Sequence, residues 1–234
     1  MMSEYGSAIC YKSSTDVYSE ALLFHISTGN KAQVYTLLES KEVDINHRDM
    51  NGYTPLIWAA DRGHADIVKH ILASKETDVN HKDNNGYTAL MWAADLGNTK
   101  VVKIIYIYIY MNNINDNTKV VQTLLKHPNI DVNAQDVDGQ TALIWAADKG
   151  HTEIVRRLVA VKDIDVNVQN NEGFTALICA AEQGYVDVVR EILEKEDIDV
   201  TLFDNVGVSA LVGATNNEHY EVVEMLRRHI GSEI

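Results

Sequence analysis

The chain has 234 residues, of which 46% are hydrophobic, so it can bury a substantial core. Its formal net charge of −14 argues against a nucleic-acid partner, because affinity for phosphate groups comes mainly from Lys and Arg. An acidic surface favours partners with basic patches. The two cysteines, Cys10 and Cys179, leave no disulfide framework and point to the cytoplasm or the nucleus.

Residues 1–18 are expected to form a flexible tail. This segment has no basic region followed by an apolar one, so it is not a signal peptide. The longest apolar run, residues 101–111, is interrupted by Lys103 and falls well short of the roughly 20 residues that a membrane-spanning helix needs. The sequence therefore predicts a soluble protein without a membrane partner.

A ten-residue string recurs along the chain. It begins at Gly52 as Gly-Tyr-Thr-Pro-Leu-Ile-Trp-Ala-Ala-Asp and returns, with variation, at Gly86, Gly139, Gly173 and Gly207. The spacing is 34 residues except between Gly86 and Gly139, where it is 53 because of an insertion of 19. A fixed period of this length indicates a stack of repeats.

Each unit is predicted to fold as a helix, a tight turn, a second helix and an extended loop. In the first copy Thr54 caps the first helix and Pro55 takes its first position. Leu56, Ala59 and Ala60 form one helical stripe, which is small because neighbouring units must approach closely. The first helices end where a left-handed residue is needed, at Gly63, Gly97, Gly150 and Gly184.

The third unit contains an insertion at residues 98–116. The string Asn-Thr-Lys-Val-Val occurs at 98–102 and again at 117–121, with alternating Ile and Tyr between the copies. An (AT)n tract encodes such an alternation, so one hypothesis is a retained intron or an expanded microsatellite, and the alternative is a genuine loop. Either copy could supply the second helix, but the second leads directly into the next loop, so we expect it to dock against the next unit.

These motifs resemble the ankyrin repeat family, whose pattern is Thr-Pro-Leu-His, Ala-Ala, Gly-His, an apolar second helix and Asp-Val-Asn. Residues 54–56, 59–60, 63–64 and 78–80 match this pattern. A tetratricopeptide array shares the period but lacks the Gly-Tyr-Thr turn and the Asp-Val-Asn loop. The family's histidine is replaced by apolar residues that are expected to substitute for it by packing, namely Ile57, Met91, Ile144, Ile178 and Val212.

The resemblance implies an all-α repeat solenoid of stacked helix-turn-helix units with β-turn loop tips. Residues 19–234 are expected to form a single domain whose first and last units have polar outer faces, as the ends of a stack require. The six units are residues 19–49, 50–83, 84–136, 137–170, 171–204 and 205–234.

The sequence carries no recognisable catalytic, cofactor-binding or metal-binding constellation. Cys179 stands at the repeat position of Trp145, so it replaces a tryptophan and is not expected to be a nucleophile. The run that begins at Asp163 resembles an EF-hand loop, but Val168 and Phe174 stand where that loop needs Gly and Glu. We therefore expect no enzyme activity, no cofactor and no metal.

In ankyrin stacks the first helices and the loop tips form a concave groove, and the resemblance implies one here. Trp58, Asp61 and Arg62 share one face of a helix, because residues three and four apart lie side by side. The repeat extends this face into two ladders. One comprises Phe24, Trp58, Trp92, Trp145 and Cys179, and the other comprises Ser27, Asp61, Asp95, Asp148 and Glu182.

Burial against a neighbouring loop is the alternative explanation of the tryptophans, although a leucine would serve that purpose equally well. Tryptophan edges beside carboxylates favour a binding site instead. The aromatic loop residues Tyr53, Tyr87 and Phe174 either contact a partner or stack on one another, and the recurring loop Asp is expected to fix the turn. The partner-binding candidates are Trp58, Asp61, Arg62, Trp92, Asp95, Trp145, Asp148, Glu182, Tyr53, Tyr87 and Phe174.

We therefore expect a monomeric scaffold that binds a basic, partly apolar segment of a partner protein through this acidic and aromatic groove. The alternative is a regulatory subunit or inhibitor that covers an enzyme surface with the same groove. An enzymatic role of the chain itself is the remote alternative.

Overall fold

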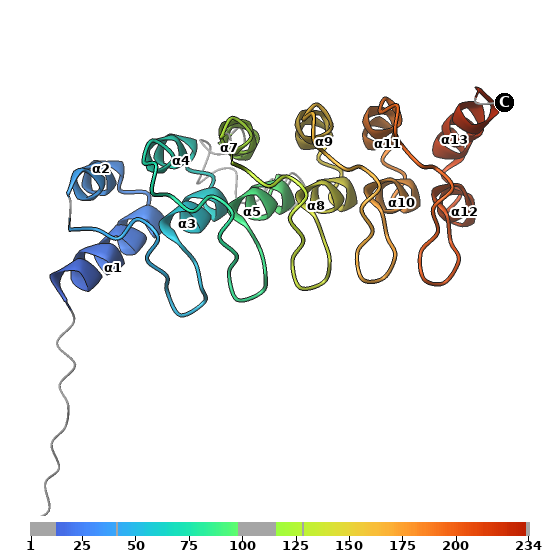
Figure 1. Cartoon of the computed structure of the whole chain (residues 1–234). Coiled ribbons are helices and arrows are strands. Elements are labelled where there is room, and N and C mark those ends of the chain that lie inside the picture. The colour runs from blue at the N-terminus through green and yellow to red at the C-terminus, as the bar shows by residue number, and fades with distance from the viewer. Residues whose placement is uncertain (1–12, 41, 98–115, 128, 233–234) are drawn as a thin grey trace, which may run out of the picture.

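The computed structural model describes residues 13–40, 42–97, 116–127 and 129–232, and it shows helical pairs stacked side by side (Figure 1). The first helices of the units are α1 (Ser14–Ser27), α3 (Pro55–Asp61), α5 (Ala89–Asp95), α8 (Ala142–Asp148), α10 (Ala176–Glu182) and α12 (Ala210–Asn216). The second helices are α2 (Lys31–Glu39), α4 (Ala65–Ile71), α7 (Asp116–Leu124), α9 (Thr152–Val159), α11 (Val186–Leu193) and α13 (Tyr220–Ser232). This arrangement confirms the predicted all-α repeat solenoid.

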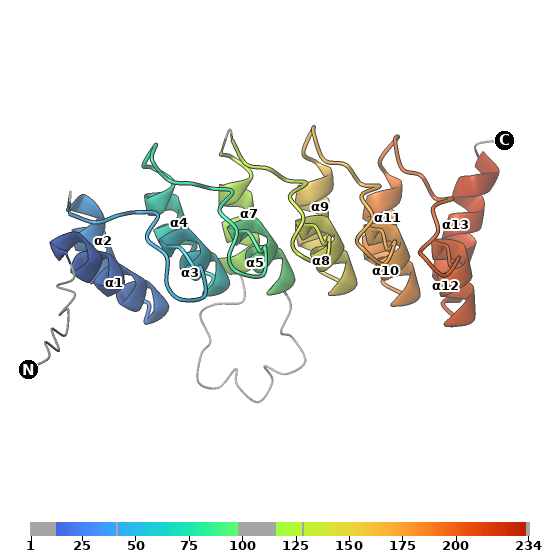
Figure 2. The same cartoon turned by 60° about the horizontal axis from the view of Figure 1, so that its bottom comes forward.

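The two sets of helices form two rows, and hairpin-like loops leave the stack on the side of the first helices (Figures 1 and 2). Each first helix from α3 onward is capped by a hydroxyl that accepts a hydrogen bond from the N–H three residues later, as the repeated Thr predicts. The capping residues and their distances are Thr54 (3.3 Å), Thr88 (3.3 Å), Thr141 (3.2 Å), Thr175 (3.2 Å) and Ser209 (3.4 Å).

The core runs along the whole stack between neighbouring units. The small stripe of Leu56, Ala59 and Ala60 is buried, which lets α3 and α5 approach each other closely. The residues that replace the family's histidine are buried in four units, as expected, but Val212 is 40% exposed. It differs because α12 lies at the end of the described stack.

Asparagine side chains join consecutive units. The amide of Asn46 donates a hydrogen bond to the carbonyl of Glu76 (2.7 Å), and its Oδ1 accepts one from the N–H of Asp78 (2.8 Å). Both bonds return at Asn80, whose partners Asn129 and Asp131 lie beyond the insertion. The stack is therefore continuous across the inserted segment.

The second copy of the duplicated string forms the second helix of the third unit. Helix α7 contains residues 117–121 and packs against α4, α5 and α9, which confirms that this copy docks onto the neighbouring units. The first copy and the Ile/Tyr run lie outside the described residues. The two hypotheses on the insertion, a retained intron or expanded microsatellite and a genuine loop, both concern those residues and stay hypotheses.

The N-terminal boundary differs from the sequence-based expectation. Helix α1 begins at Ser14, so residues 14–18 are helical and do not belong to a tail, while residues 1–12 lie outside the described part. Ser13 Oγ accepts a hydrogen bond from the N–H of Asp16, whose carboxylate accepts one from the N–H of Ser13, both at 3.1 Å. This capping box is a helix-start signal that the repeat pattern does not contain.

The expected left-handed residues are found after most first helices. Gly63, Gly150 and Gly184 have positive φ, as predicted. Gly97 does not, so that prediction was wrong for one unit. Gly97 is the last described residue before the inserted segment.

Candidate functional site

The surface built by the first helices and the loops that precede them is called the inner face below. Its loops are shaped by one acidic side chain each. Asp49 Oδ1 accepts hydrogen bonds from the N–H groups of Asn51 and Tyr53, both at 2.9 Å. The same pair of bonds forms at Asp83, Asp136, Asn170 and Asp204. The recurring Asp therefore fixes the turn, as the sequence predicts.

The second oxygen of the loop carboxylate binds the tryptophan of the first helix that follows the loop. The indole Nε1–H donates to Oδ2 of Asp49 from Trp58 (3.1 Å), of Asp83 from Trp92 (2.9 Å) and of Asp136 from Trp145 (3.1 Å). A leucine could not make this bond, so the argument that leucine would serve equally well was wrong. Where Cys179 replaces the tryptophan, the uncharged Asn170 replaces the loop aspartate.

The tyrosines lie between the tryptophans of consecutive units. The Tyr53 ring centroid is 5.3 Å from that of Trp58 and 5.4 Å from that of Trp92. Tyr87 is 5.0 Å from Trp92 and 5.5 Å from Trp145. These ring contacts join consecutive units, and the predicted contact of these two tyrosines with a partner stays a prediction. We call Trp58, Tyr53, Trp92, Tyr87 and Trp145 the aromatic ladder.

The aromatic ladder ends at the fourth unit. The next loop position is Gln140, and the next tryptophan position is Cys179. Phe174 packs against the apolar core but makes no ring contact with the ladder in the described part of the chain. The predicted aromatic candidates therefore fall into one continuous group and one separate residue.

Carboxylates occupy the neighbouring helix position in four consecutive units. Asp61, Asp95, Asp148 and Glu182 are all half-buried. Burial raises the pKa of Asp61, with Arg62 opposing the shift, and it also raises the pKa of Asp95, with Lys149 opposing the shift. Burial likewise raises the pKa of Glu182. The charges of Asp61, Asp95 and Glu182 are therefore less favourable in the folded protein than in water.

Two cations of the chain itself lie on the tryptophans. The guanidinium of Arg62 is 5.2 Å from the Trp58 ring centroid, and its Nε is 3.3 Å from Oδ2 of Asp61. The Nζ of Lys149 is 5.3 Å from the Trp145 centroid and 3.0 Å from Oδ2 of Asp148. Lys149 was missed in the sequence, although it occupies the repeat position of Arg62 and register alone could have found it.

Exposed apolar side chains on the loop tips were also missed. Met50 is 91% exposed, Val137 62% and Val206 83%. They stand at or next to the turn, where the repeat tolerates any residue, so only their exposure in the folded chain distinguishes them. Phe24, at the tryptophan position of the first unit, is 62% exposed.

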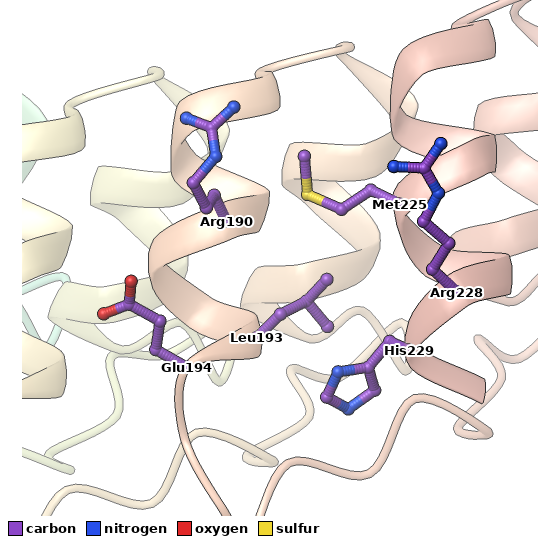
Figure 3. A pocket seen from close by; sticks show the side chains of 6 residues that line it. All are labelled: Arg190, Leu193, Glu194, Met225, Arg228 and His229. Carbon is purple, nitrogen blue, oxygen red and sulfur yellow. The ribbon is translucent and has the colours of Figure 1, made fainter. Parts of the chain in front are cut away.

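A hollow of about 430 Å³ lies on the opposite side of the stack, between α11 and α13 (Figure 3). It is lined by Arg190, Leu193, Glu194, Met225, Arg228 and His229. Arg190 and Arg228 are each paired with a carboxylate of their own helix, Asp187 and Glu224. None of the sequence-predicted candidates lines this hollow.

Removing the three carboxylates with raised pKa should stabilise the protein at neutral pH. A raised pKa means that the folded state favours the protonated form. The stability that each protonated carboxyl contributes to the folded state is complete below its unfolded-state pKa, and it is lost as the pH rises through its folded-state pKa. We expect the variant Asp61→Asn, Asp95→Asn, Glu182→Gln to exceed the wild type by up to about 1 kcal/mol in unfolding free energy at neutral pH.

Urea titrations at several pH values between roughly 4 and 7 would measure this difference. The advantage of the variant should shrink towards the acidic end, because the wild-type carboxyls are then protonated. An advantage that stays constant with pH would contradict the assignment of the shift to these three groups.

Comparison with known proteins points to one family. A family model described as "Ankyrin repeats (3 copies)" matches residues 22–117, 108–204 and 162–234. The structure is similar to that of the ankyrin repeat protein EF0377, with a TM-score of 0.76, 26% identity and coverage of 89% of this chain and 97% of that one. An ankyrin repeat domain from Acinetobacter baumannii AYE covers the same shares with 26% identity and a TM-score of 0.74.

One curated relative is similar over a short segment. The acyl-CoA-binding domain-containing protein 6 of Bos taurus is 47% identical over 49 residues, which are 21% of this chain and 16% of that protein. In the described part of this chain no group of three His, Cys, Asp or Glu side chains could hold a metal ion. None of the described helices is long and apolar enough to cross a membrane.

Proposed function

Since this chain belongs to the ankyrin repeat family, whose repeats are generally protein-interaction modules, we propose that its inner face binds a basic, partly apolar segment of a partner protein. The surface that does so comprises the four carboxylates, the exposed edges of the aromatic ladder and Arg62 and Phe174. These residues are the partner-binding candidates predicted from the repeated sequence positions.

The observation that carries the proposal is the row of half-buried carboxylates. Asp61, Asp95 and Glu182 each have a raised pKa because of burial, so each charge disfavours folding. An asparagine or glutamine would fit the same positions without that penalty. Destabilising groups that recur on one surface are typical of a site kept for function.

The spacing of the carboxylates suits an extended partner. Neighbouring packed helices lie about 8–10 Å apart, and an extended chain advances about 3.3 Å per residue. A segment running along the inner face would therefore present every third side chain to successive units. Lys or Arg at those positions would meet Asp61, Asp95, Asp148 and Glu182 in turn.

A regulatory subunit or inhibitor that covers an enzyme surface would use the same inner face, so it remains the alternative within this proposal. We propose further that the chain acts as a monomer in the cytoplasm or nucleus and not as an enzyme. Its net charge of −14 supports a protein partner with a basic surface over a nucleic acid.

The test neutralises the inner face without touching the aromatic ladder. The inner-face variant combines Asp61→Asn, Asp95→Asn, Asp148→Asn and Glu182→Gln. Its matched control changes the charge equally on the second helices. The control substitutions are Asp66→Asn, Asp187→Asn, Glu221→Gln and Glu224→Gln, all at exposed positions.

Wild type and both variants, immobilised at equal density, would be compared by quantitative affinity capture from cells that express this chain. We expect the inner-face variant to lose captured proteins at least about tenfold, while the control retains them. The captured proteins should also elute at raised salt, because exposed charge pairs are screened. Equal capture by all three forms would show that the inner face is not the binding surface.

A further inference from the structure

The position that follows each inner-face carboxylate differs between units in a regular way. It is Arg62 in the second unit and Lys149 in the fourth, and each cation lies over the tryptophan four residues earlier. Each also pairs with the carboxylate next to it in sequence. The chain therefore shows twice how a tryptophan and a carboxylate together hold a cation at this point of the repeat.

The third unit keeps this arrangement but has no cation of its own at that position. Trp92 and Asp95 stand where Trp58 and Asp61 stand in the second unit, while the place of Arg62 is taken by Leu96. No cation of the described residues lies over the Trp92 ring. The fifth unit lacks the aromatic part altogether, because Cys179 replaces the tryptophan. We call Trp92, Asp95 and Leu96 the Trp92 site.

The packing of Trp92 is compatible with a further ligand. Tyr87 contacts Trp92 from the loop of the same unit, and Tyr53 contacts it from the loop of the preceding unit. A residue four positions further along the helix approaches the ring along the helix axis instead. Lys149 contacts Trp145 in this way although Tyr87 also packs against that ring.

The charges around Asp95 favour a cation as well. Lys149 lowers the pKa of this carboxylate, but its Nζ is hydrogen-bonded to Asp148 at 3.0 Å. Asp95 is half-buried, so an arriving cation would be partly screened from water and would interact more strongly than at an open surface.

We infer that the Trp92 site binds an arginine side chain of the partner, with the guanidinium over the Trp92 ring and paired with Asp95. Arginine suits the site better than lysine, because its planar group both stacks on an aromatic ring and pairs with a carboxylate. This inference rests on the proposed function only in requiring that the inner face be open to a partner.

The test uses the tripeptide Ac-Ala-Arg-Ala-NH2 as a probe, with Ac-Ala-Gln-Ala-NH2 as the neutral control. The chain has three tryptophans, so their indole N–H signals in a nitrogen-15 NMR spectrum report on three equivalent positions at once. We expect the arginine peptide, at millimolar concentration, to shift the Trp92 signal at least about threefold more than the signals of Trp58 and Trp145.

Two substitutions should move the response between units. Leu96→Arg supplies the missing cation and should abolish the shift of Trp92, whereas the uncharged control Leu96→Met should retain it. Arg62→Leu removes the cation of the second unit, so the arginine peptide should then also shift the indole N–H signal of Trp58. Equal shifts at all three tryptophans, or a Trp92 response that survives Leu96→Arg, would overturn the inference.

The inference and the proposed function can fail separately. If partner capture depends on the four carboxylates but is unchanged by Leu96→Arg, the inner face binds its partner without an arginine at Trp92, and the inference is wrong. If the tripeptide selects Trp92 but no captured protein depends on the carboxylates, the inference holds and the proposed function is wrong.

Discussion

Replacing Trp145 by Ala should lower the free energy of unfolding by about 3–5 kcal/mol. The substitution removes a half-buried indole that stacks on Tyr87, 5.5 Å away, and that donates its N–H to Asp136. Asp136 is only 8% exposed, so Oδ2 would lose its donor in a place where water replaces it poorly. Urea unfolding followed by circular dichroism would measure the loss.

The next loop and first helix along the chain supply the matched control. There Cys179 and Asn170 occupy the positions of Trp145 and Asp136. We expect Trp145→Cys combined with Asp136→Asn to be more stable than Trp145→Cys alone by about 1–2 kcal/mol, because the amide removes the stranded charge. If Asp136→Asn instead deepens the loss, the carboxylate does not depend on the indole.

Replacing Gly173 by Ala should cost about 2–4 kcal/mol. Its φ is +86°, which disfavours any side chain, and a Cβ would lie 2.7 Å from the backbone N of Asn205 and 2.8 Å from Cα of Asp204. These atoms belong to the next loop, whose Asn205 N–H donates to the carbonyl of Glu172 at 2.9 Å. The substitution would therefore separate two units as well as strain one residue.

Gly207 allows the two effects to be separated. Its φ is +87°, but a Cβ there would meet no atom within 4 Å in the described part of the chain. We expect Gly207→Ala to cost only about 1 kcal/mol, which is the conformational strain alone. Equal losses for the two variants in the same urea titrations would show that contact between loops contributes nothing to stability.

These expectations affect how the binding surface must be studied. The tryptophans of the inner face hold the loops in place through Asp49, Asp83 and Asp136, so removing them would disturb the fold and the surface together. Neutralising the carboxylates Asp61 and Asp95 is expected to cost no stability, because burial raises the pKa of both. A binding defect in such variants would therefore report on recognition and not on folding.

The local chemistry of the sequence predicts most of the unit. The Thr caps, the buried Leu-Ala-Ala stripe and the Asp-fixed turn each depend on residues within about ten positions of one another, and all were predicted. The start of α1 was missed because its signal, the Ser13 and Asp16 capping box, occurs only once. Because this capping box is not part of the repeat, the repeat pattern could not predict it.

The partners of the aromatic side chains could not be predicted in the same way. The sequence places Tyr53 on a loop and Trp92 on a helix, 39 positions further on, but their contact depends on the distance and rotation between two stacked units. The pairing of Trp58 with Asp49 likewise depends on how the loop folds back over the helix. These distances follow from packing along the stack.

By itself, then, the sequence determined that the chain is a stack of ankyrin repeats, where its helices begin in the repeated units and which positions share a face, because period and capping are local properties. The tertiary structure decided which side chains of that face are bound to one another. It tied the tryptophans to the loops and placed the tyrosines between units, and among the described residues it put a cation over Trp58 and Trp145 but none over Trp92. Contacts between units arise only when the stack forms, because each joins residues that separate repeats bring together.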